Sequence, residues 1–280
     1  MSRPDPPAVP DGWDLHRTTR DGVDLAYYRR PGDGPPLLAV HGLTDFAPRL
    51  FDLLEALGDY DVLAPDVRGH GRSGAPESGY DVPRAAADLR AVVEDAGVDG
   101  RPVVLGHSLG GGIVTSYAAR HPVSAVVAID PVGFLFTPPD DADAADDGDS
   151  ATENGDGPAA PGPDGDWVTE SVESARDALD AGATDVHPAA YASTRASQFL
   201  GLPSSFPHER YRAVRAPTLV LRADVDEADR DGDGPLLEQF DDGRVHYVEG
   251  AGHVVYLDRP DRTAELVSEF LADAGVAPKG

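Results

Sequence analysis

The chain has 280 residues, 40% of them hydrophobic, which allows one large domain with a sizeable core. Its 50 acidic and 23 basic residues give a formal net charge of −27, which argues against nucleic-acid binding. It contains no cysteine, which excludes disulfide bonds, thiolate nucleophiles and cysteine-based metal sites.

The acidic composition is typical of proteins adapted to high salt. Arginine supplies nearly all the positive charge, because Lys279 is the single lysine. Self-repulsion of this size destabilises a compact chain until salt screens it, so we expect a halophilic protein. Residues 1–14 are polar and Pro-rich, and no run of about 18 apolar residues occurs. We therefore expect no signal peptide, no membrane span and a cytoplasmic location.

The hydrophobic pattern predicts strands that alternate with helices. Residues 13–19 and 23–30 flank Asp21-Gly22 and predict an antiparallel hairpin. Continuous apolar runs predict strands buried on both faces at 35–40, 60–65, 103–107, 124–129, 217–221 and 245–248. Helical spacing marks residues 50–57, 84–96, 109–121 and 262–272. The expected fold is α/β, with a mainly parallel central sheet of about eight strands flanked by helices.

The alternation stops in the middle of the chain. Residues 138–166 are rich in Asp, Ala, Gly and Pro and contain no Lys or Arg, so we expect a disordered or loosely attached acidic segment. Two short helices are predicted around 170–179 and 188–199. We interpret 132–206 as a cap or lid inserted into a core made of 1–131 and 207–280. Its apolar residues, some of which we expect to line a substrate pocket, are Phe134, Leu135, Phe136, Trp167, Phe199 and Leu200.

One motif carries recognisable chemistry. Gly106-His107-Ser108-Leu109-Gly110 fits G-x-S-x-G between a predicted strand and a predicted helix. In that setting the serine lies on a sharp turn, exposed above the sheet at a helix N-terminus that favours negative charge. The flanking glycines remove Cβ atoms that would clash in so tight a turn. The alternative is an ordinary helix N-cap, but the surrounding strand and helix favour a nucleophile.

Five blocks, each following a predicted strand, resemble the α/β-hydrolase superfamily. They are His41-Gly42, residues 66–73, Gly106 to Gly110, Asp224 to Asp226, and Gly250 to His253. The likeness covers nearly the whole chain outside the acidic segment. The elbow resembles that of esterase-like members, which use a serine nucleophile. It implies a catalytic triad in the chain order nucleophile, acid, histidine.

The resemblance assigns Ser108 as nucleophile and His253 as base. His253 lies in the Gly-rich loop between the last predicted strand and helix, where an imidazole can take the serine proton. His107 is the variable residue of the elbow, and the family uses His41 and His70 structurally.

The resemblance leaves three candidates for the acid that orients the histidine. The family pattern after the seventh strand is Gly-x-x-Asp, and this chain has alanine in place of the glycine, in Ala223-Asp224-Val225-Asp226. Counting along the motif selects Asp226, with Asp224 as the second choice. Asp130 is the third, because some members place the acid after the sixth strand.

An oxyanion hole is implied at two backbone N–H groups. One belongs to Leu109, directly after the nucleophile, and the other to Leu43, after His41-Gly42. Each such donor typically contributes about 10²–10³ in rate.

We expect no metal and no cofactor. Residues 229–234 match the start of a calcium loop, but Phe240 stands where a calcium-binding glutamate belongs. We interpret this segment, like the acidic run 140–149, as solvated.

The residues favour an enzyme that acts on a small molecule. A serine at the elbow favours hydrolysis of a small or medium, largely apolar carboxylic ester through an acyl-enzyme. A lactonase or a carbon–carbon bond hydrolase would use the same triad. Such enzymes often hold an anionic substrate with an arginine, for which Arg195 is a candidate, although a surface role suits it better. A non-catalytic protein that binds a small ligand is an alternative of another class. Neither nucleic acid nor membrane is an expected partner, and the sequence leaves the oligomeric state open.

Overall fold

The computed structural model describes residues 4–131, 166–183, 187–200, 213–226, 230, 233, 237, 238 and 240–278. One eight-stranded sheet runs through the molecule in the order β1-β2-β4-β3-β5-β6-β7-β8. The β1–β2 and β2–β4 pairs are antiparallel, and every later pair is parallel. The strands are β1 (Asp14–Arg20), β2 (Val23–Arg30), β3 (Pro36–Val40), β4 (Asp61–Pro65), β5 (Val103–His107), β6 (Ala125–Ile129), β7 (Thr218–Arg222) and β8 (Gly243–Tyr247). The predicted α/β architecture is confirmed.

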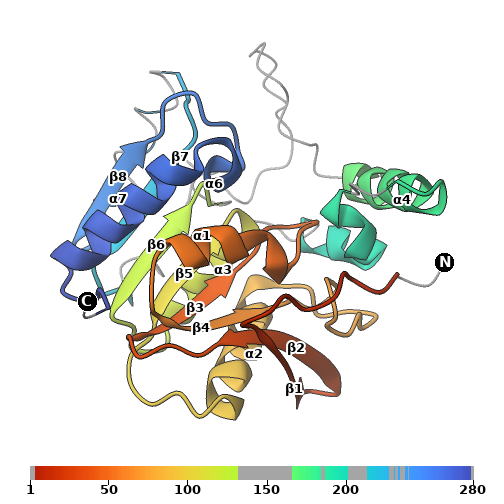
Figure 1. Ribbon diagram of the computed structural model, residues 1–280, viewed down its shortest axis with the longest axis horizontal. Coiled ribbons are helices and arrows are strands. Elements are labelled where there is room, and N and C mark those ends of the chain that lie inside the picture. The colour runs from red at the N-terminus through yellow and green to blue at the C-terminus, as the bar shows by residue number, and fades with distance from the viewer. Residues whose placement is uncertain are drawn as a thin grey trace, which may run out of the picture.

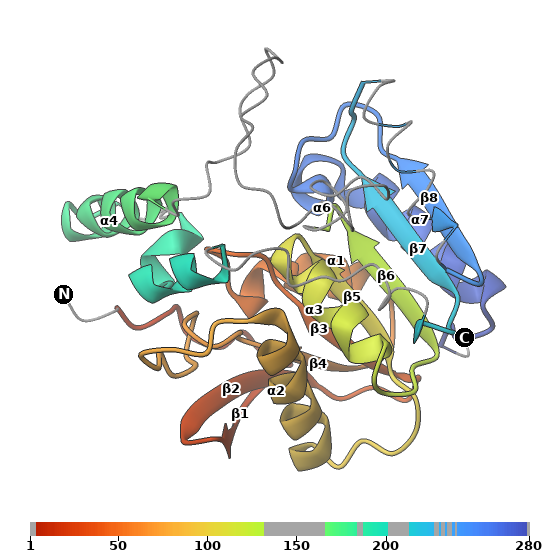
Figure 2. The same cartoon turned by 180° about the vertical axis from the view of Figure 1, so that it is seen from behind.

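Helices cover both faces of the sheet. In Figure 1, α1 (Phe51–Ala56), α6 (Val255–Asp258) and α7 (Pro260–Asp273) lie in front of it. Figure 2 shows α2 (Val82–Asp95) and α3 (Leu109–Ala118) on the opposite face. A 3-10 turn, η1 (Ala47–Leu50), leads into α1.

The central strands are apolar throughout because each face meets a different helix layer. In β3, Leu37 and Ala39 join the cluster beneath α1 and α7, whereas Leu38 and Val40 join the cluster beneath α2 and α3. The pleat therefore sends alternate residues of one continuous run into two cores.

The described part of the insertion contains α4 (Asp166–Asp180) and two 3-10 helices, η2 (Pro188–Tyr191) and η3 (Thr194–Phe199). A small cluster of Val168, Val172 and alanines holds α4 against them. Arg176 reinforces it, because its guanidinium donates to the carbonyls of Ala190 and Ala192. We call these three helices the cap helices; they lie together at one side of the sheet (Figure 1).

Parts of the predicted insertion lie outside the described residues. These are residues 132–165, which include the acidic segment and Phe134, Leu135 and Phe136, the side chains of Asp166 and Trp167, and residues 184–186 and 201–206. The domain boundaries therefore stay a prediction.

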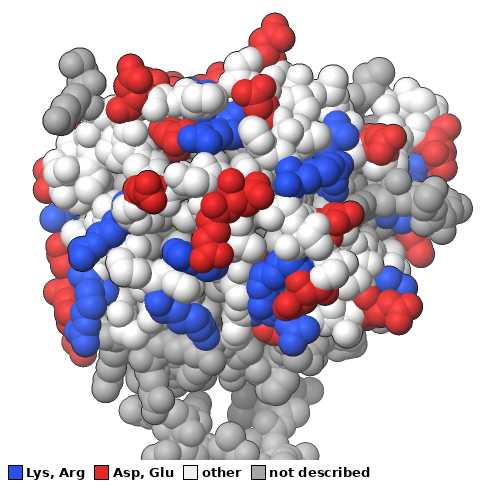
Figure 3. All heavy atoms as spheres, turned by 90° about the horizontal axis from the view of Figure 1, so that it is seen from below, with Lys and Arg blue, Asp and Glu red and all other residues white. Residues whose placement is uncertain are grey.

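Charges of both signs lie side by side on the molecular face in Figure 3. Several exposed or half-buried arginines make ion pairs, among them Arg29–Asp61 at 2.9 Å and Arg244–Asp273 at 3.0 Å. Such pairs typically contribute about 0–1 kcal/mol each. They offset only part of the repulsion among the acidic groups.

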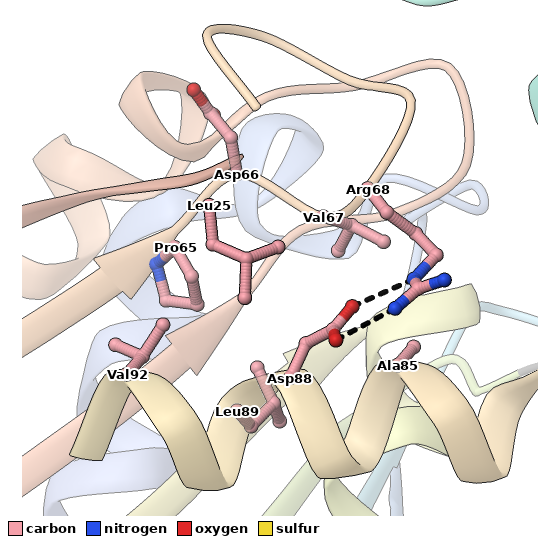
Figure 4. Close-up of a pocket in the computed structure, with 9 residues that line it drawn as sticks. All are labelled: Leu25, Pro65, Asp66, Val67, Arg68, Ala85, Asp88, Leu89 and Val92. Carbon is pink, nitrogen blue, oxygen red and sulfur yellow. Dashed lines mark hydrogen bonds and ion pairs between the residues drawn. The ribbon is translucent and has the colours of Figure 1, made fainter. Parts of the chain in front are cut away.

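One ion pair lies inside the molecule. Arg68 donates from Nε and Nη2 to the carboxylate of Asp88 in α2, both at 2.7 Å, and both side chains are buried (Figure 4). The adjacent cavity, bounded by Leu25, Val92 and their neighbours, measures about 10 Å³. That volume suits at most one water molecule, so this place is structural and not a ligand site.

Candidate active site

The turn between β5 and α3 has the strained geometry that its sequence predicts. Ser108 has φ 51° and ψ −118°, a conformation that non-glycine residues rarely adopt. Its N–H donates to the Ile129 carbonyl at 2.9 Å, which ties the turn to the end of β6. The strained serine is thus fixed from the neighbouring strand.

Two glycines allow this turn to close. A Cβ at Gly106 would collide with the carbonyl of Gly110, and a Cβ at Gly110 would collide with the carbonyl of Val40. Backbone atoms make both collisions, so no side-chain movement can relieve them. The glycines let α3 start directly against β3 and β5.

His253 links the serine to a carboxylate. It lies in the loop between β8 and α6, and its Nε2 is 2.9 Å from Ser108 Oγ. Its Nδ1 is 2.7 Å from Oδ2 of Asp130. A carboxylate can only accept, so Nδ1 carries the proton and the lone pair of Nε2 faces the serine hydroxyl. This tautomer can remove the proton of Ser108.

The structure brings to His253 a different aspartate from the one that motif counting selects. Asp130, the third candidate, lies where we predicted Asp226. Asp226 is exposed on the loop after β7. Asp224, the second choice, accepts from the Gly250 N–H at 2.8 Å and pairs with Arg230 at 3.2 Å. These two bonds of Asp224 support the loop that carries His253, and neither of them reaches the imidazole ring.

Asp130 is held tightly where β6 ends. Its φ of 39° lies in the left-handed region, which aspartate tolerates better than most residues, and its N–H donates to Leu221 at 2.7 Å. Oδ1 accepts from Nη1 of Arg222 at 2.8 Å and from the N–H of Ala223 at 3.3 Å. Burial alone would raise the pKa of Asp130, but the hydrogen bond from His253 and the charge of Arg222 outweigh burial and lower it. The carboxylate is ionised at neutral pH.

Two buried histidines shape the loop that follows β3. His41 donates from Nδ1 to the carbonyl of Gly42 at 2.8 Å and accepts the N–H of Val67 at 3.0 Å. His70 accepts the N–H of Thr44 at 3.2 Å. Burial, the largest cause, lowers the pKa of His41 well below its usual value, so it is neutral. Its role is structural, as the resemblance implies.

This loop lies directly against the nucleophile. A Cβ at Gly42 would be 3.3 Å from Cβ of Ser108. Leu43 follows, and its side chain packs against both the core and the cap helices. Leu109 is the first residue of α3, where a helix N–H has no acceptor within its own helix. The structure thus brings both backbone segments expected of an oxyanion hole to Ser108.

Two contacts that sequence reasoning missed join these loops. Nε2 of His107, the variable elbow residue, donates to the carbonyl of His253 at 2.9 Å, and burial lowers the pKa of His107 to about 4. The Tyr256 hydroxyl donates to the buried carboxylate of Asp45 at 3.1 Å. Burial raises the pKa of Asp45 to about 6. No sequence signal for either contact exists beyond the presence of polar residues in loops that meet.

Of the segment with the calcium-like pattern, the structure describes Arg230 and Asp233. Arg230 is exposed, but Asp233 differs from our prediction of a solvated loop, because it is buried and its Oδ2 accepts from Nε of Arg222 at 2.9 Å. Among the residues that the structure describes, no group of three His, Asp or Glu side chains is arranged to hold a metal ion. Arg195 donates to the carbonyl of Ala75 at 3.1 Å and is half exposed, which suits the surface role.

Within the described ranges, no helix has the length and apolar character needed to cross a membrane.

A strained serine at a strand–helix turn, hydrogen-bonded through histidine to aspartate, defines the class of α/β proteins with a nucleophile elbow. The alpha/beta hydrolase family model matches residues 37–266, so the chain belongs to this family. The chain is 45% identical over 111 residues to a bifunctional esterase/perhydrolase of Acinetobacter calcoaceticus, covering 38% of this chain and 39% of that protein. It is 28% identical over 263 residues to a 2-(acetamidomethylene)succinate hydrolase of Mesorhizobium japonicum, covering 87% and 90%. The solved structure of an esterase from Rhodococcus sp. ECU1013 has a TM-score of 0.67 at 23% identity, covering 94% and 100%, and shares the fold.

Proposed function

We propose that the protein is a serine hydrolase that cleaves a small or medium, largely apolar carboxylic ester through an acyl-enzyme. The observation that carries this proposal is the continuous hydrogen-bonded chain from Ser108 through His253 to Asp130. A binding protein has no need for this chain or for a strained serine at its end.

In the proposed first step, Ser108 Oγ attacks the ester carbonyl while its proton passes to Nε2 of His253. Asp130 stabilises the imidazolium, and the N–H groups of Leu43 and Leu109 donate to the oxyanion. The imidazolium then protonates the leaving alcohol as the carbon–oxygen bond breaks. In the second step, water gives a proton to His253 and attacks the acyl carbonyl. The bond to Ser108 Oγ then breaks as the imidazolium returns that proton to the serine, which releases the acid.

The preference for an apolar acyl group is supported by the surroundings of the oxyanion loop. Leu43 packs between the core and the cap helices, whose cluster consists of valines and alanines. Phe46 and Tyr191 contact across the same junction, with ring centroids 5.1 Å apart. Where such apolar side chains exclude water from a bound ester, electrostatic interactions in the transition state become stronger. The esterase/perhydrolase name of one relative agrees with ester chemistry.

The experiment is hydrolysis of p-nitrophenyl esters of increasing acyl length in concentrated KCl, with Ser108→Ala as the control. We expect the wild type to turn over and the variant to lose activity by about 10⁴-fold or more. The optimal chain length would size the pocket. Labelling of Ser108 by a fluorophosphonate tests the nucleophile separately. Labelling without ester turnover would move the proposal to lactones or carbon–carbon bonds, and absence of both would favour a binding role.

A further inference from the structure

The carboxylate of Asp130 is held from two opposite sides. His253 donates a hydrogen bond to Oδ2, while Arg222 and the N–H of Ala223 donate to Oδ1. Arg222 is the last residue of β7, the strand after which the resemblance implies the acid. In this chain the end of that strand supplies a cation, and the acid comes from the neighbouring strand.

Arg222 is enclosed, with only 1% of its side chain exposed. Its Nε donates to a second carboxylate, Asp233, at 2.9 Å, and the Tyr247 hydroxyl donates to the same oxygen at 3.0 Å. A buried guanidinium is tolerated only when it is paired and hydrogen-bonded. We call Asp130, Arg222 and Asp233 the acid cluster; it carries one net negative charge while His253 is neutral.

We propose that Arg222 is a positioning residue, which turns the carboxylate of Asp130 toward His253 and limits the negative charge that this carboxylate presents to the imidazole. The inference rests on the proposed serine-hydrolase function. The planar fork of arginine can donate to two carboxylates at once, which fixes the rotation of Asp130 about its side-chain bonds. With Oδ1 occupied, Oδ2 is the oxygen left for Nδ1 of His253.

The charge effect has a definite sign. The positive charge of Arg222 opposes the formation of an imidazolium at His253. The negative charge of Asp233 favours it, but its effect is smaller because Asp233 lies beyond Arg222. If Arg222 and Asp233 are neutralised together, the imidazolium becomes more favourable. Coulomb's law for one charge of each sign at unequal distances from the imidazole gives a shift of the order of one pH unit. The acidic limb of the kcat/KM profile moves toward higher pH by this amount.

Other titratable groups surround His253. His107 lies on β5 with its ring centroid 4.9 Å away, and its pKa of about 4 leaves it neutral over the working range. Tyr256 on α6 contacts His107, and Asp45 and Arg49 lie near Tyr256. The Asp224–Arg230 pair supports the loop after β7. These groups are the same in wild type and variant, so a difference between the two profiles isolates the acid cluster.

The test compares Arg222→Gln/Asp233→Asn with wild type and with Arg222→Lys. The double variant removes one charge of each sign, so Asp233 is not left as a buried carboxylate without its cation, and Asp130 keeps its bonds from the Ala223 N–H and His253. We expect kcat to fall about tenfold or more per active site, counted by fluorophosphonate titration, and the acidic limb to move up by about one pH unit. Arg222→Lys keeps the charge without the fork, so we expect a lower kcat with an unmoved limb.

Arg68→Gln/Asp88→Asn is the matched control, because it removes a buried ion pair of the same kind elsewhere (Figure 4). We expect it to lower the melting temperature and leave the acidic limb in place. If Arg222→Gln/Asp233→Asn behaves like this control, with unchanged kcat per active site and an unchanged limb, the positioning role is refuted.

A second readout needs no turnover. The ¹⁵N resonances of the His253 ring, assigned with His253→Gln, report the pH at which the ring takes up a proton. We expect this pH to rise in the double variant and to stay in Arg222→Lys; the same pH in all three proteins would refute the inference. If the wild type neither hydrolyses esters nor reacts with the fluorophosphonate, the proposed function fails, and this measurement still decides the effect of Arg222.

Discussion

Replacing Asp130 by asparagine distinguishes the aspartate that contacts His253 from the one that motif counting selects. Asparagine has nearly the same shape but offers one acceptor oxygen and one donor NH₂ group. In the protein, Oδ1 of Asp130 faces Arg222 and Ala223, and Oδ2 faces His253. The single oxygen of asparagine can satisfy only one of these sides.

We expect the asparagine oxygen to face Arg222. A charged, buried guanidinium that faces another donor loses more free energy than a neutral imidazole does. The NH₂ group then points at Nδ1 of His253 and forces the ring proton onto Nε2. The imidazole can no longer accept the proton of Ser108. Loss of the correct tautomer in triads of this type lowers kcat by about 10⁴-fold, which is about 5.4 kcal/mol of transition-state stabilisation.

The assay is kcat/KM on a p-nitrophenyl ester in concentrated KCl, with Asp226→Asn as the matched control and circular dichroism melting as the test of folding. We expect Asp130→Asn to lose about 10³–10⁴-fold and Asp226→Asn to stay within about threefold. A large loss in Asp226→Asn together with a loss below tenfold in Asp130→Asn would refute the assignment.

Three further predictions concern stability and salt. Gly110→Ala should lose about 3 kcal/mol or more, because its Cβ would collide with the Val40 carbonyl, whereas Gly12→Ala, with φ 84° and open space, should lose only about 1 kcal/mol in urea unfolding. Because folding raises the pKa of Asp45 to about 6, the advantage of its neutral form is complete near pH 4 and is lost as the pH rises through 6. Asp45→Asn should therefore be more stable than wild type at pH 8, by up to about 3 kcal/mol, and equal to it near pH 4; equal stability at both pH values would contradict this. Activity should fall as KCl is diluted below about 1 M, and full activity with an unchanged melting temperature in dilute buffer would refute salt adaptation.

Most of the core could be predicted because each strand is a continuous apolar run between turn residues. The observed ends of β3 to β7 lie within one or two residues of the predictions. The short helix α6 was missed because four residues are too few to show a helical period. The single helix predicted over 188–199 is two 3-10 turns, between which the Ser193 N–H donates to Gly69.

The aspartate beside His253 could not be predicted because its position depends on contacts between strands. Motif counting follows one loop, from Ala223 to Asp226, whereas the partner of His253 is decided where β6 and β7 end side by side. The decisive contact is the buried pair of Arg222 with Asp130, residues 92 positions apart. Nothing in the local pattern around Asp226 reports that pair. Ser108 and His253, by contrast, each stand in a local pattern of their own, and the structure brings them together as expected.

The bonds that join the site span very different distances along the chain. Ser108 and His253 are 145 positions apart, and the Tyr256–Asp45 bond spans 211. During synthesis the nucleophile emerges 145 residues before the histidine, so a growing chain has no base beside its serine until residue 253 has left the ribosome. We therefore expect a chain that ends before His253 to fail to react with a fluorophosphonate, even where its elbow has formed. Reaction at Ser108 would thus count only molecules in which the two distant segments have come together.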